Sequence, residues 1–273
     1  MTLLKKLNKK YPNKKAFITG AASGLGYAFA RLLADNGWSL YLSDINIASL
    51  EELRATLDGA KELHTFELDV SNKLSYERTV EAIRKNTSQI DLVVNNAGIG
   101  DGEFFQDYKS DLWERMIRIN LMGVYYGCHH FVPWMIKQSS GTIINIGSAA
   151  GFMNAPGMSA YNVSKAGVYA LSETLYHELK SKNIHVSVVT PTFFKTNIMS
   201  QAKGSQGFVN FAEKQMNHST TNADEMAMVV LSKAASGVFQ IVHPKEARRN
   251  YFFKKWFPGL VAKKFQEMLA KLS

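Results

Sequence analysis

Short apolar segments rich in β-branched residues alternate along the chain with longer amphipathic segments of helical length. The short segments are continuously apolar, which is typical of strands that are covered on both faces. They predict strands at residues 16–19, 40–43, 65–68, 92–94, 142–146, 185–189 and 238–242. The amphipathic segments predict helices at residues 25–36, 48–57, 75–85, 112–136, 159–182 and 224–234. This alternation predicts an α/β fold with a parallel sheet and helices on both of its faces.

The pattern favours one large domain over residues 15–242, flanked by a basic extension at 1–14 and a basic amphipathic tail at 243–273. No repeat or linker interrupts the sequence of this domain. Residues 192–220 are its least regular part, with Gly204 and Gly207 among many polar side chains. An irregular segment of this length in an α/β domain is usually a lid or disordered, and we expect a substrate lid.

The net charge of +9 is concentrated at the two ends of the chain. Residues 1–15 contain six lysines and no acidic residue, and residues 243–273 contain eight Lys or Arg and two Glu. The residues between them therefore carry a net charge of −3, which argues against a body that binds nucleic acid. Either the basic ends contact an acidic surface, or they are solvated chain ends.

The single cysteine, Cys128, excludes an internal disulfide, so the fold does not depend on an oxidising compartment. No apolar segment of the signal-peptide kind follows the basic N-terminus. The sequence also lacks the run of about 18 apolar residues that a membrane-spanning helix needs. We expect a cytoplasmic protein, with peripheral contact at a membrane surface as an open alternative.

A glycine-rich turn, TGAASGLG at residues 19–26, joins the first predicted strand to the first predicted helix. Its glycines, Gly20, Gly24 and Gly26, allow a tight turn and let backbone N–H groups approach a pyrophosphate closely. The N-terminus of the helix adds unpaired donors and a partial positive charge. Three glycines alone are a weak signal, but a strand before and a helix after them favour a dinucleotide site.

An acidic residue, Asp44, ends the second predicted strand, 18 residues after Gly26. An acid at this position is expected to bind the adenosine ribose hydroxyls and to repel a 2′-phosphate. Neither Ser23 in the turn nor the residues 45–47 after Asp44 supply a compensating cation. The sequence therefore favours NAD, with NADP as the alternative cofactor. Alternatively, Asp44 caps the helix that follows it.

Candidate chemistry lies at the start of the long helix predicted at residues 159–182, where Tyr161 and Lys165 are four residues apart and share one face. Tyrosine has an ordinary pKa of about 10, and a nearby ammonium favours the phenolate and lowers that pKa. Ser148 ends the fifth predicted strand, at the sheet edge where ligands bind, and its hydroxyl can donate to a developing alkoxide. Each feature also has an ordinary explanation, since Tyr and Lys often occur at this spacing by chance and serine often forms turns.

Taken together, these motifs resemble the short-chain dehydrogenase/reductase family over about residues 14–242. The match includes the glycine turn, Asp69, residues 95–98 (NNAG), Asn120, Ser148, Tyr161, Lys165 and the segment from Pro191 to Thr196. The resemblance implies a Rossmann-type doubly wound parallel sheet of about seven strands in the order 3-2-1-4-5-6-7. One departure is Thr192, which follows Pro191 where the family commonly has glycine.

The resemblance also implies the roles of individual residues. Tyr161 would be the general acid/base, and Lys165 would lower its pKa and bind the nicotinamide ribose. Ser148 would hold the substrate oxygen, while Asn120 would bend its helix and support a proton-relay water near Lys165. The implied cofactor contacts are Gly20, Ser23, Gly24, Leu25, Gly26, Asp44, Asp69, Val70, Asn96, Ala97, Gly98, Tyr161, Lys165, Pro191 and Thr196.

The predicted function is an NAD(P)-dependent oxidoreductase that moves a hydride between nicotinamide and an alcohol or carbonyl carbon. Met153, Met158 and Met199 flank the expected substrate region and favour an apolar substrate, either steroid-like, retinoid-like or long-chain. No metal site is expected, because adjacent histidines such as His129 and His130 diverge by roughly 100° on a helix. The family often forms dimers or tetramers, which implies a homo-oligomer here. Alternatives are a non-catalytic dinucleotide-binding regulatory protein and a membrane-surface binding module.

The C-terminal tail shows apolar residues at three- and four-residue steps beside many lysines. The apolar positions are Phe253, Trp256, Phe257, Leu260, Val261, Phe265, Met268, Leu269 and Leu272. The lysines are Lys254, Lys255, Lys263, Lys264 and Lys271. Pro258 is expected to end one helix or to start another. The apolar face would pack on its own domain or on a partner subunit, lie on an anionic membrane, or dock an acidic carrier protein.

Overall fold

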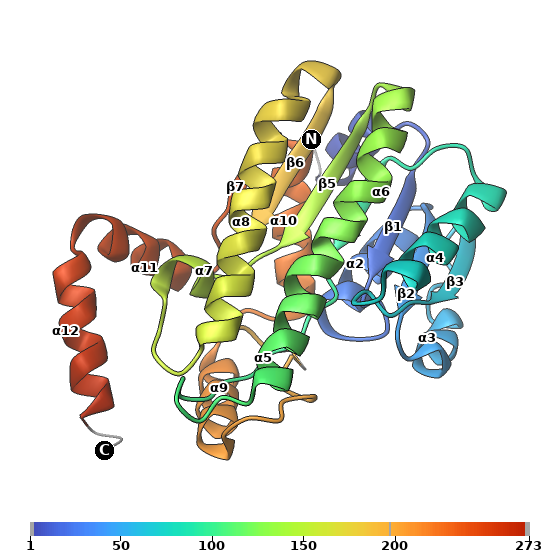
Figure 1. Cartoon of the computed structure of the whole chain (residues 1–273). Helices are drawn as coiled ribbons and strands as arrows, with labels where there is room; N and C mark the ends of the chain where they lie inside the picture. Colours follow the sequence, from blue (N-terminus) through green and yellow to red (C-terminus); the bar gives the residue numbers. More distant parts are fainter. Residues whose placement is uncertain (1–2, 197, 271–273) are drawn as a thin grey trace.

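The computed structural model describes residues 3–196 and 198–270, and they form a parallel sheet with helices on both faces (Figure 1). The seven strands have the order β3-β2-β1-β4-β5-β6-β7, as the family resemblance implies. They are β1 Lys15–Thr19, β2 Ser39–Asp44, β3 Glu62–Glu67, β4 Leu92–Asn95, β5 Gly141–Ile146, β6 Ile184–Val189 and β7 Gln240–Ile241. The α/β fold predicted from the alternating pattern is therefore confirmed.

Twelve α-helices are found in the described part of the chain. They are α1 Leu3–Lys10, α2 Gly24–Ala34, α3 Ile47–Arg54, α4 Lys73–Asn86, α5 Ser110–Ile117, α6 Gly123–Gln138, α7 Ala150–Met153, α8 Ser159–Leu179, α9 Gln206–His218, α10 Ala223–Ala235, α11 Lys245–Trp256 and α12 Pro258–Leu269. None of the helices in these described ranges is both long and apolar enough to cross a membrane.

Two apolar cores lie on the two faces of the sheet, and successive side chains of β1 enter them alternately. Ile18 joins α1, α2 and α10 in the core on one face. Phe17 joins α4, α6 and α8 in the core on the other face, where its ring stacks on Phe131 at 4.9 Å between centroids. Continuous apolar strands are required here because both faces of the sheet are covered.

The predicted helix at residues 112–136 is interrupted. The structure divides it into α5 and α6, joined by a π-helical turn, Arg118–Met122, that contains Asn120. The amphipathic pattern of the sequence continues through residues 118–122. Periodicity alone therefore did not predict the π-helical turn. The two edge strands also differ from prediction: β3 begins at Glu62 because its edge position tolerates exposed polar residues, and β7 has only two paired residues.

The interpretation of the N-terminal extension as a solvated chain end is wrong for Leu7 and Tyr11, which are both buried. The Tyr11 ring packs edge-on against Trp38 at 5.5 Å. Lys10 Nζ donates a 2.9 Å hydrogen bond to the carbonyl oxygen of Ala234 in α10. The segment that includes α1 and Tyr11 is therefore packed into the domain core. Its many lysines led the sequence analysis to overlook these two buried positions.

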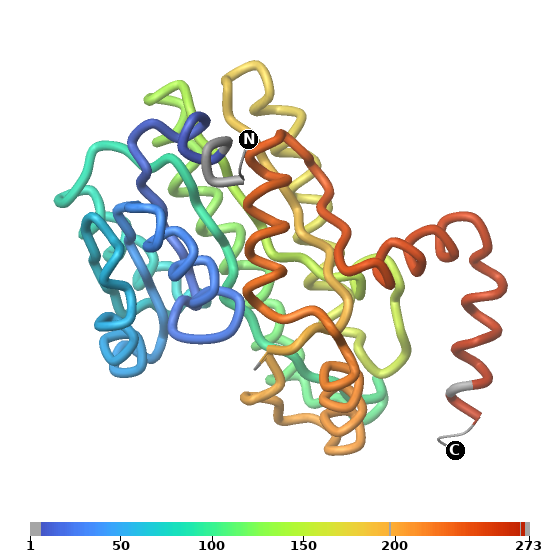
Figure 2. Tube along the Cα trace, turned by 180° about the vertical axis from the view of Figure 1, so that it is seen from behind, coloured from blue at the N-terminus to red at the C-terminus, as the bar shows by residue number. Residues whose placement is uncertain are grey.

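The irregular segment predicted at residues 192–220 contains a helix, α9, that the sequence analysis missed. Polar side chains dominate its exposed face, while Ala212 and Met216 are buried. The tail forms α11 and α12, with Pro258 as the first residue of α12. Both views show α12 standing clear of the domain, with α11 connecting it to the body (Figures 1 and 2). Lys271, Leu272 and the side chain of Met268 lie outside the described residues.

The prediction that the tail packs on its own domain is wrong for most of its apolar face. Trp256 and Leu260 are 62% and 60% exposed, and Phe253 and Phe257 are also exposed. Val261 is buried, and Phe265 and Leu269 are half-buried. The aromatic part of the tail is therefore exposed in this chain.

We predict that Leu7→Ala lowers the free energy of unfolding by about 2–4 kcal/mol, because it leaves a cavity between α1 and the core. Leu74→Ala is the matched control, since Leu74 is 60% exposed on α4 and should change stability by less than about 0.5 kcal/mol. Urea denaturation of both variants measures the difference. Equal, small changes would show that α1 contributes nothing to the core.

Candidate active site

Three positions of the glycine turn, Gly20, Gly24 and Gly26, accept no residue other than glycine. Gly20 and Gly24 have φ angles of +65° and +53°, which disfavour any side chain. A Cβ on Gly20 would lie 2.8 Å from Ala97 Cα, and one on Gly26 would overlap the Gly20 carbonyl oxygen. The turn therefore brings the ends of β1 and β4 and the start of α2 into direct backbone contact.

The N-terminus of α2 is left open by this turn. Ser23 stands at the N-cap position in extended conformation, and its side chain makes no capping hydrogen bond. The first N–H groups of a helix, here those of Gly24, Leu25 and Gly26, have no partner within the helix. Leu25 is buried and anchors this end. Uncapped donors beside a glycine cradle, at the positive end of the helix dipole, fit the pyrophosphate of a dinucleotide.

Thr19 is a positioning residue that the site prediction did not include, although it begins the glycine motif. Its hydroxyl accepts hydrogen bonds from the N–H groups of Asn96 and Ala97, both at 3.0 Å. The Asn96 side-chain amide in turn donates to the carbonyl oxygens of Thr19 at 3.0 Å and Gly20 at 3.1 Å. These bonds fasten the segment after β4 to the glycine turn, so Asn96 supports the turn from behind.

Asp44 lies against the same turn. One carboxylate oxygen accepts from Ala22 N–H at 3.0 Å, and the other accepts from Asn46 N–H at 3.0 Å. The alternative that Asp44 caps the next helix is wrong, because the Asn46 side chain caps α3 by accepting from Ser49 N–H. Asp44 is thus held in place by the backbone, at the position predicted for contact with the ribose.

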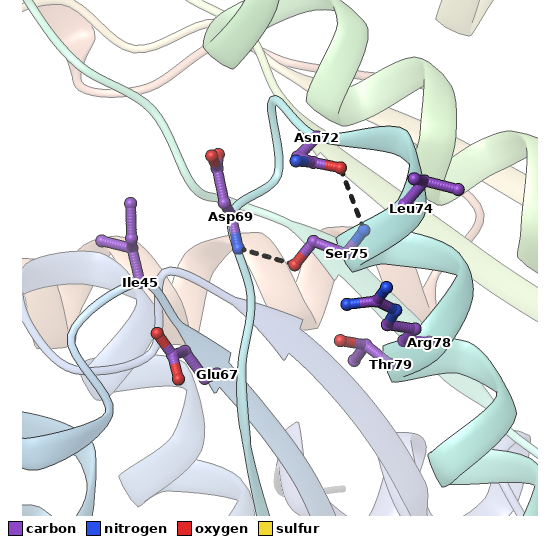
Figure 3. Close-up of a pocket in the computed structure, with 8 residues that line it drawn as sticks. All are labelled: Ile45, Glu67, Asp69, Asn72, Leu74, Ser75, Arg78 and Thr79. Carbon is purple, nitrogen blue, oxygen red and sulfur yellow. Dashed lines mark hydrogen bonds between the residues drawn. The ribbon is translucent and has the colours of Figure 1, made fainter.

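A hollow of about 460 Å³ lies beside Ile45, the residue after Asp44, between the ends of β2 and β3 and the start of α4 (Figure 3). It is lined by Ile45, Glu67, Asp69, Asn72, Leu74, Ser75, Arg78 and Thr79. Asp69 was predicted here, but Arg78 was not, because it lies 34 residues after Asp44. The expectation that no cation lies near this end is therefore wrong: Figure 3 shows Arg78 extending from α4 into the hollow.

Val70 is buried, and its side chain lies under the start of α6, where a Cβ on Gly123 would come within 3.0 Å of it. The Val70 side chain thus serves packing, and its backbone is the part that would face a cofactor. On the other side of the turn, the Thr196 hydroxyl lies 3.1 Å from the place of a Gly24 Cβ. Residues 172 positions apart therefore meet at the glycine turn.

Ser148, Tyr161 and Lys165 come together at the carboxyl edge of the sheet. Tyr161 and Lys165 lie on the first turns of α8, both buried, with Lys165 Nζ 5.6 Å from the Tyr161 ring centroid. The Ser148 hydroxyl follows β5 and is a hydrogen-bond partner of the Tyr161 phenol. Lys165 Nζ donates a 2.9 Å hydrogen bond to the Ile146 carbonyl oxygen, which fixes the ammonium beneath the site.

Burial acts on both titrating groups of this cluster. It raises the pKa of the Tyr161 phenol, and the hydrogen bond with Ser148 works in the opposite direction. Burial lowers the pKa of Lys165 to about 8, so its ammonium is still protonated at neutral pH. The predicted lowering of the Tyr161 pKa by Lys165 is not the dominant effect here, because desolvation outweighs it. Near neutral pH, this arrangement presents a phenol that can give a proton.

Asn120 occupies the π-helical turn between α5 and α6, which matches the predicted bend. Its side-chain oxygen accepts from Ile99 N–H and its amide donates to the Ile99 carbonyl, both at 2.9 Å. A Cβ on Gly98 would lie 3.0 Å from Asn120 Oδ1 and 3.6 Å from Lys165 Nζ. Glycine at position 98 therefore lets the loop after β4 pass between Asn120 and Lys165.

Pro191 also joins the cluster through its backbone. Its carbonyl oxygen accepts from Ala149 N–H at 2.7 Å and from the Ser148 hydroxyl at 3.5 Å. The Ser148 hydroxyl also accepts from Ala150 N–H at 3.1 Å, so the turn-forming role considered for this serine is real as well. The segment after β6 thus holds Ser148 in place.

The segment predicted to be a lid is bound to the loop that follows β4. The buried Asp101 carboxylate accepts from the N–H groups of Lys203 at 3.2 Å and Gly204 at 2.8 Å. The Phe208 ring of α9 fills the space beside Gly102 and Gly157, where any side chain at either glycine would overlap it. Sequence reasoning missed this attachment, whose two halves lie about 100 residues apart.

Comparison with known proteins agrees with this geometry. The family model described as short chain dehydrogenase matches residues 14–206. A 3-oxoacyl-(acyl-carrier-protein) reductase of Thermotoga maritima is 36% identical over 184 residues, 67% of this chain and 75% of that protein.

Two solved structures have the same fold. A short-chain dehydrogenase/reductase from Burkholderia phymatum in complex with NAD has a TM-score of 0.82 and 29% identity, covering 89% of this chain and 93% of that one. A short-chain dehydrogenase from Sphingobium yanoikuyae in complex with NADPH has a TM-score of 0.76 and 26% identity, covering 91% and 95%.

We predict that Lys165→Met changes how stability depends on pH. The unfolded chain keeps the Lys165 proton up to its ordinary pKa of 10.5, whereas the folded chain releases it from about pH 8. The folded wild type therefore gains stability relative to Lys165→Met as the pH rises through this window. Denaturant unfolding at several pH values measures this gain, with the exposed Lys85→Met as control. A difference that stays constant with pH would contradict the prediction.

Proposed function

The chain belongs to the short-chain dehydrogenase/reductase family and is an NAD(P)-dependent oxidoreductase of alcohol and carbonyl groups, and we propose that it interconverts an apolar secondary alcohol and its ketone with NAD, using Tyr161 as general acid/base. The observation that carries the proposal is the burial of Tyr161 between the Ser148 hydroxyl and the Lys165 ammonium. The alternative of a non-catalytic dinucleotide-binding protein is not favoured, since all four predicted catalytic side chains are present.

In the reductive direction, the Tyr161 phenol gives its proton to the carbonyl oxygen while a hydride reaches the carbonyl carbon. A bound nicotinamide supplies that hydride, or accepts it in the reverse reaction. The Ser148 hydroxyl donates a hydrogen bond to the same oxygen, which stabilises the charge that develops there. The Lys165 ammonium stabilises the phenolate that remains, and Asn120 positions the loop beside it. In oxidation, the phenolate takes the proton back from the alcohol.

The cofactor would be held by the open N-terminus of α2, by Asp44 at the adenosine ribose and by the hollow at Asp69. The nicotinamide end would lie between Lys165, Pro191 and Thr196, the residues that converge at the carboxyl edge. Asp44 favours NAD because its carboxylate would repel a 2′-phosphate. Arg78 acts in the opposite direction, so the preference rests on the balance between these two side chains.

The proposed substrate is apolar because the surroundings of Tyr161 are apolar. Tyr161 packs in a cluster with Ile99, Met116 and Ala160, against which the partly buried Met158 also packs. Met199 approaches from the lid, beside Gly100. The name of the Thermotoga relative, an oxoacyl reductase, supports a long-chain oxo compound over a steroid-like or retinoid-like one.

We further propose a homodimer or homotetramer that works in the cytoplasm and touches a membrane peripherally. Exposed apolar side chains on the two long helices, Tyr125 on α6 and Val163 on α8, support assembly through this face. The exposed tail supports the membrane contact.

We predict that Tyr161→Phe lowers kcat for an apolar alcohol or ketone by at least about 100-fold, because the general acid/base is lost. NADH affinity, followed by its fluorescence, should change little, since the ring and the fold remain. Tyr169→Phe is the matched control, on the same face of α8 two turns later, and should leave turnover intact. Retained turnover in Tyr161→Phe would refute the proposed role.

We predict that Asp44→Ser raises NADPH affinity relative to NADH by about tenfold, because it removes the repulsion of the 2′-phosphate. Asp58→Ser, an exposed acid that does not line the hollow, serves as control. Titration of both nucleotides by fluorescence gives the ratio. If the wild type prefers NADPH and Arg78→Gln abolishes this preference, the proposal of NAD is wrong.

A further inference from the structure

We infer that α11 and α12, here called the tail hairpin (residues 245–269), form a docking surface for an anionic lipid membrane. The inference deepens the proposed peripheral membrane contact, and it does not depend on which substrate the enzyme turns over. Its support comes from three features of the hairpin: its attachment, its exposed aromatic side chains and its unpaired positive charge.

The hairpin is attached to the rim of the catalytic site. Ala247 is buried at the start of α11, and the Tyr251 ring meets Phe152 of α7 edge-on at 5.0 Å. Helix α7 begins two residues after Ser148, so the attachment point adjoins the catalytic serine. Helix α12 extends away from this point, clear of the domain, and its far end lies at the same end of the molecule as the lid helix α9 (Figure 1).

Large apolar side chains gather where the two helices meet. The rings of Phe252, Phe253 and Phe257 lie 5.9–6.1 Å apart and are all exposed. Trp256 and Leu260, at 62% and 60% exposure, extend this patch. A contiguous apolar patch on a soluble protein usually marks an interaction site. Tryptophan and phenylalanine on an amphipathic helix are the side chains that enter the interface of a bilayer.

Basic residues lie on both helices that carry the patch. Arg248, Arg249, Lys254 and Lys255 lie on α11, and Lys263 and Lys264 lie on α12. The only acidic residues of the hairpin are Glu246 and Glu267, and in the described chain no ion pair involves any side chain of α11 or α12. Lys255 Nζ lies 5.3 Å from the Trp256 ring centroid, so cation and aromatic ring are presented together.

An anionic membrane is the occupant that satisfies both features at once. Pairing with the hairpin of a second copy would cover the aromatic patch but would bring two strongly basic surfaces together. An acidic protein surface would neutralise the lysines, yet it would need a matching apolar groove for five exposed side chains. A lipid surface offers both anionic headgroups for the basic residues and an apolar layer for the exposed aromatic side chains. Docking would also place the catalytic rim where an apolar substrate dissolves.

The test is sedimentation of the full-length protein with vesicles. We expect binding to phosphatidylcholine vesicles that contain about one third phosphatidylserine, and much weaker binding to phosphatidylcholine alone. Lys263→Gln/Lys264→Gln should weaken binding to the anionic vesicles roughly 30-fold, and Trp256→Ser/Phe257→Ser at least about tenfold. The matched controls are Lys61→Gln/Lys85→Gln and Phe105→Ser/Met228→Ser, exposed residues of the body that should leave binding unchanged.

Absence of sedimentation with the anionic vesicles, or equal binding by hairpin and control variants, would overturn the inference. A loss of oligomer mass by light scattering in Trp256→Ser/Phe257→Ser, without any vesicle binding by the wild type, would assign the patch to a second copy. Binding to polyglutamate without vesicle binding would assign it to an acidic protein. NADH titration of every variant confirms folding, and because vesicle binding needs no turnover, failure of the catalytic proposal remains distinguishable.

Discussion

The position of β1 between β2 and β4 is the constraint on which the rest of the molecule depends. The connection after β1 leads to β2 on one side, whereas the connection after β4 leads to β5 on the other side. The carboxyl edge of the sheet is therefore left uncovered between β1 and β4. Into this opening the chain directs the glycine turn, the Asn96 amide and the uncapped end of α2. The same edge receives Ser148 from the end of β5 and Thr196 from beyond β6. Strand order thus concentrates residues from most of the chain at one site.

Chemistry at this edge depends on a balance between desolvation and specific partners. Burial disfavours charge on both Tyr161 and Lys165, which raises the pKa of the phenol and lowers that of the ammonium. The Ile146 carbonyl and the Ser148 hydroxyl are the polar partners that offset this effect. As a result, a neutral proton donor stands beside a cation that can stabilise its anion. The buried site makes such an interaction stronger than it would be in water.

The two ends of the chain show that similar composition can lead to opposite structural roles. Both are rich in lysine, yet α1 buries Leu7 against the core while the tail leaves Trp256 and Leu260 exposed, and α12 stands clear of the domain. The difference lies in what each helix meets. Helix α1 lies against α10 and the start of the sheet, whereas α11 turns the chain outward after its contact with α7. Burial in the core therefore depends on the position of each helix relative to the domain and not on its composition.

Much of the fold and of the chemistry could be predicted from the sequence, because these features depend on short-range pattern. Apolar strands alternating with amphipathic helices determine a parallel α/β sheet. The glycine spacing determines the turn, and a four-residue step places Tyr161 and Lys165 on one helical face. Even the bend at Asn120 was anticipated, although through family resemblance and not through periodicity.

Only the tertiary structure decided which distant residues meet. It brought Arg78 to the hollow beyond Asp44, bound the segment around Gly204 to Asp101, and buried Leu7 while leaving Trp256 exposed. None of these features can be predicted from neighbouring residues in the sequence. The contacts join side chains far apart in the chain, and the burial or exposure of a side chain depends on what lies opposite its helix. Periodicity shows that a helix has an apolar face, but the covering of that face is determined by packing in three dimensions.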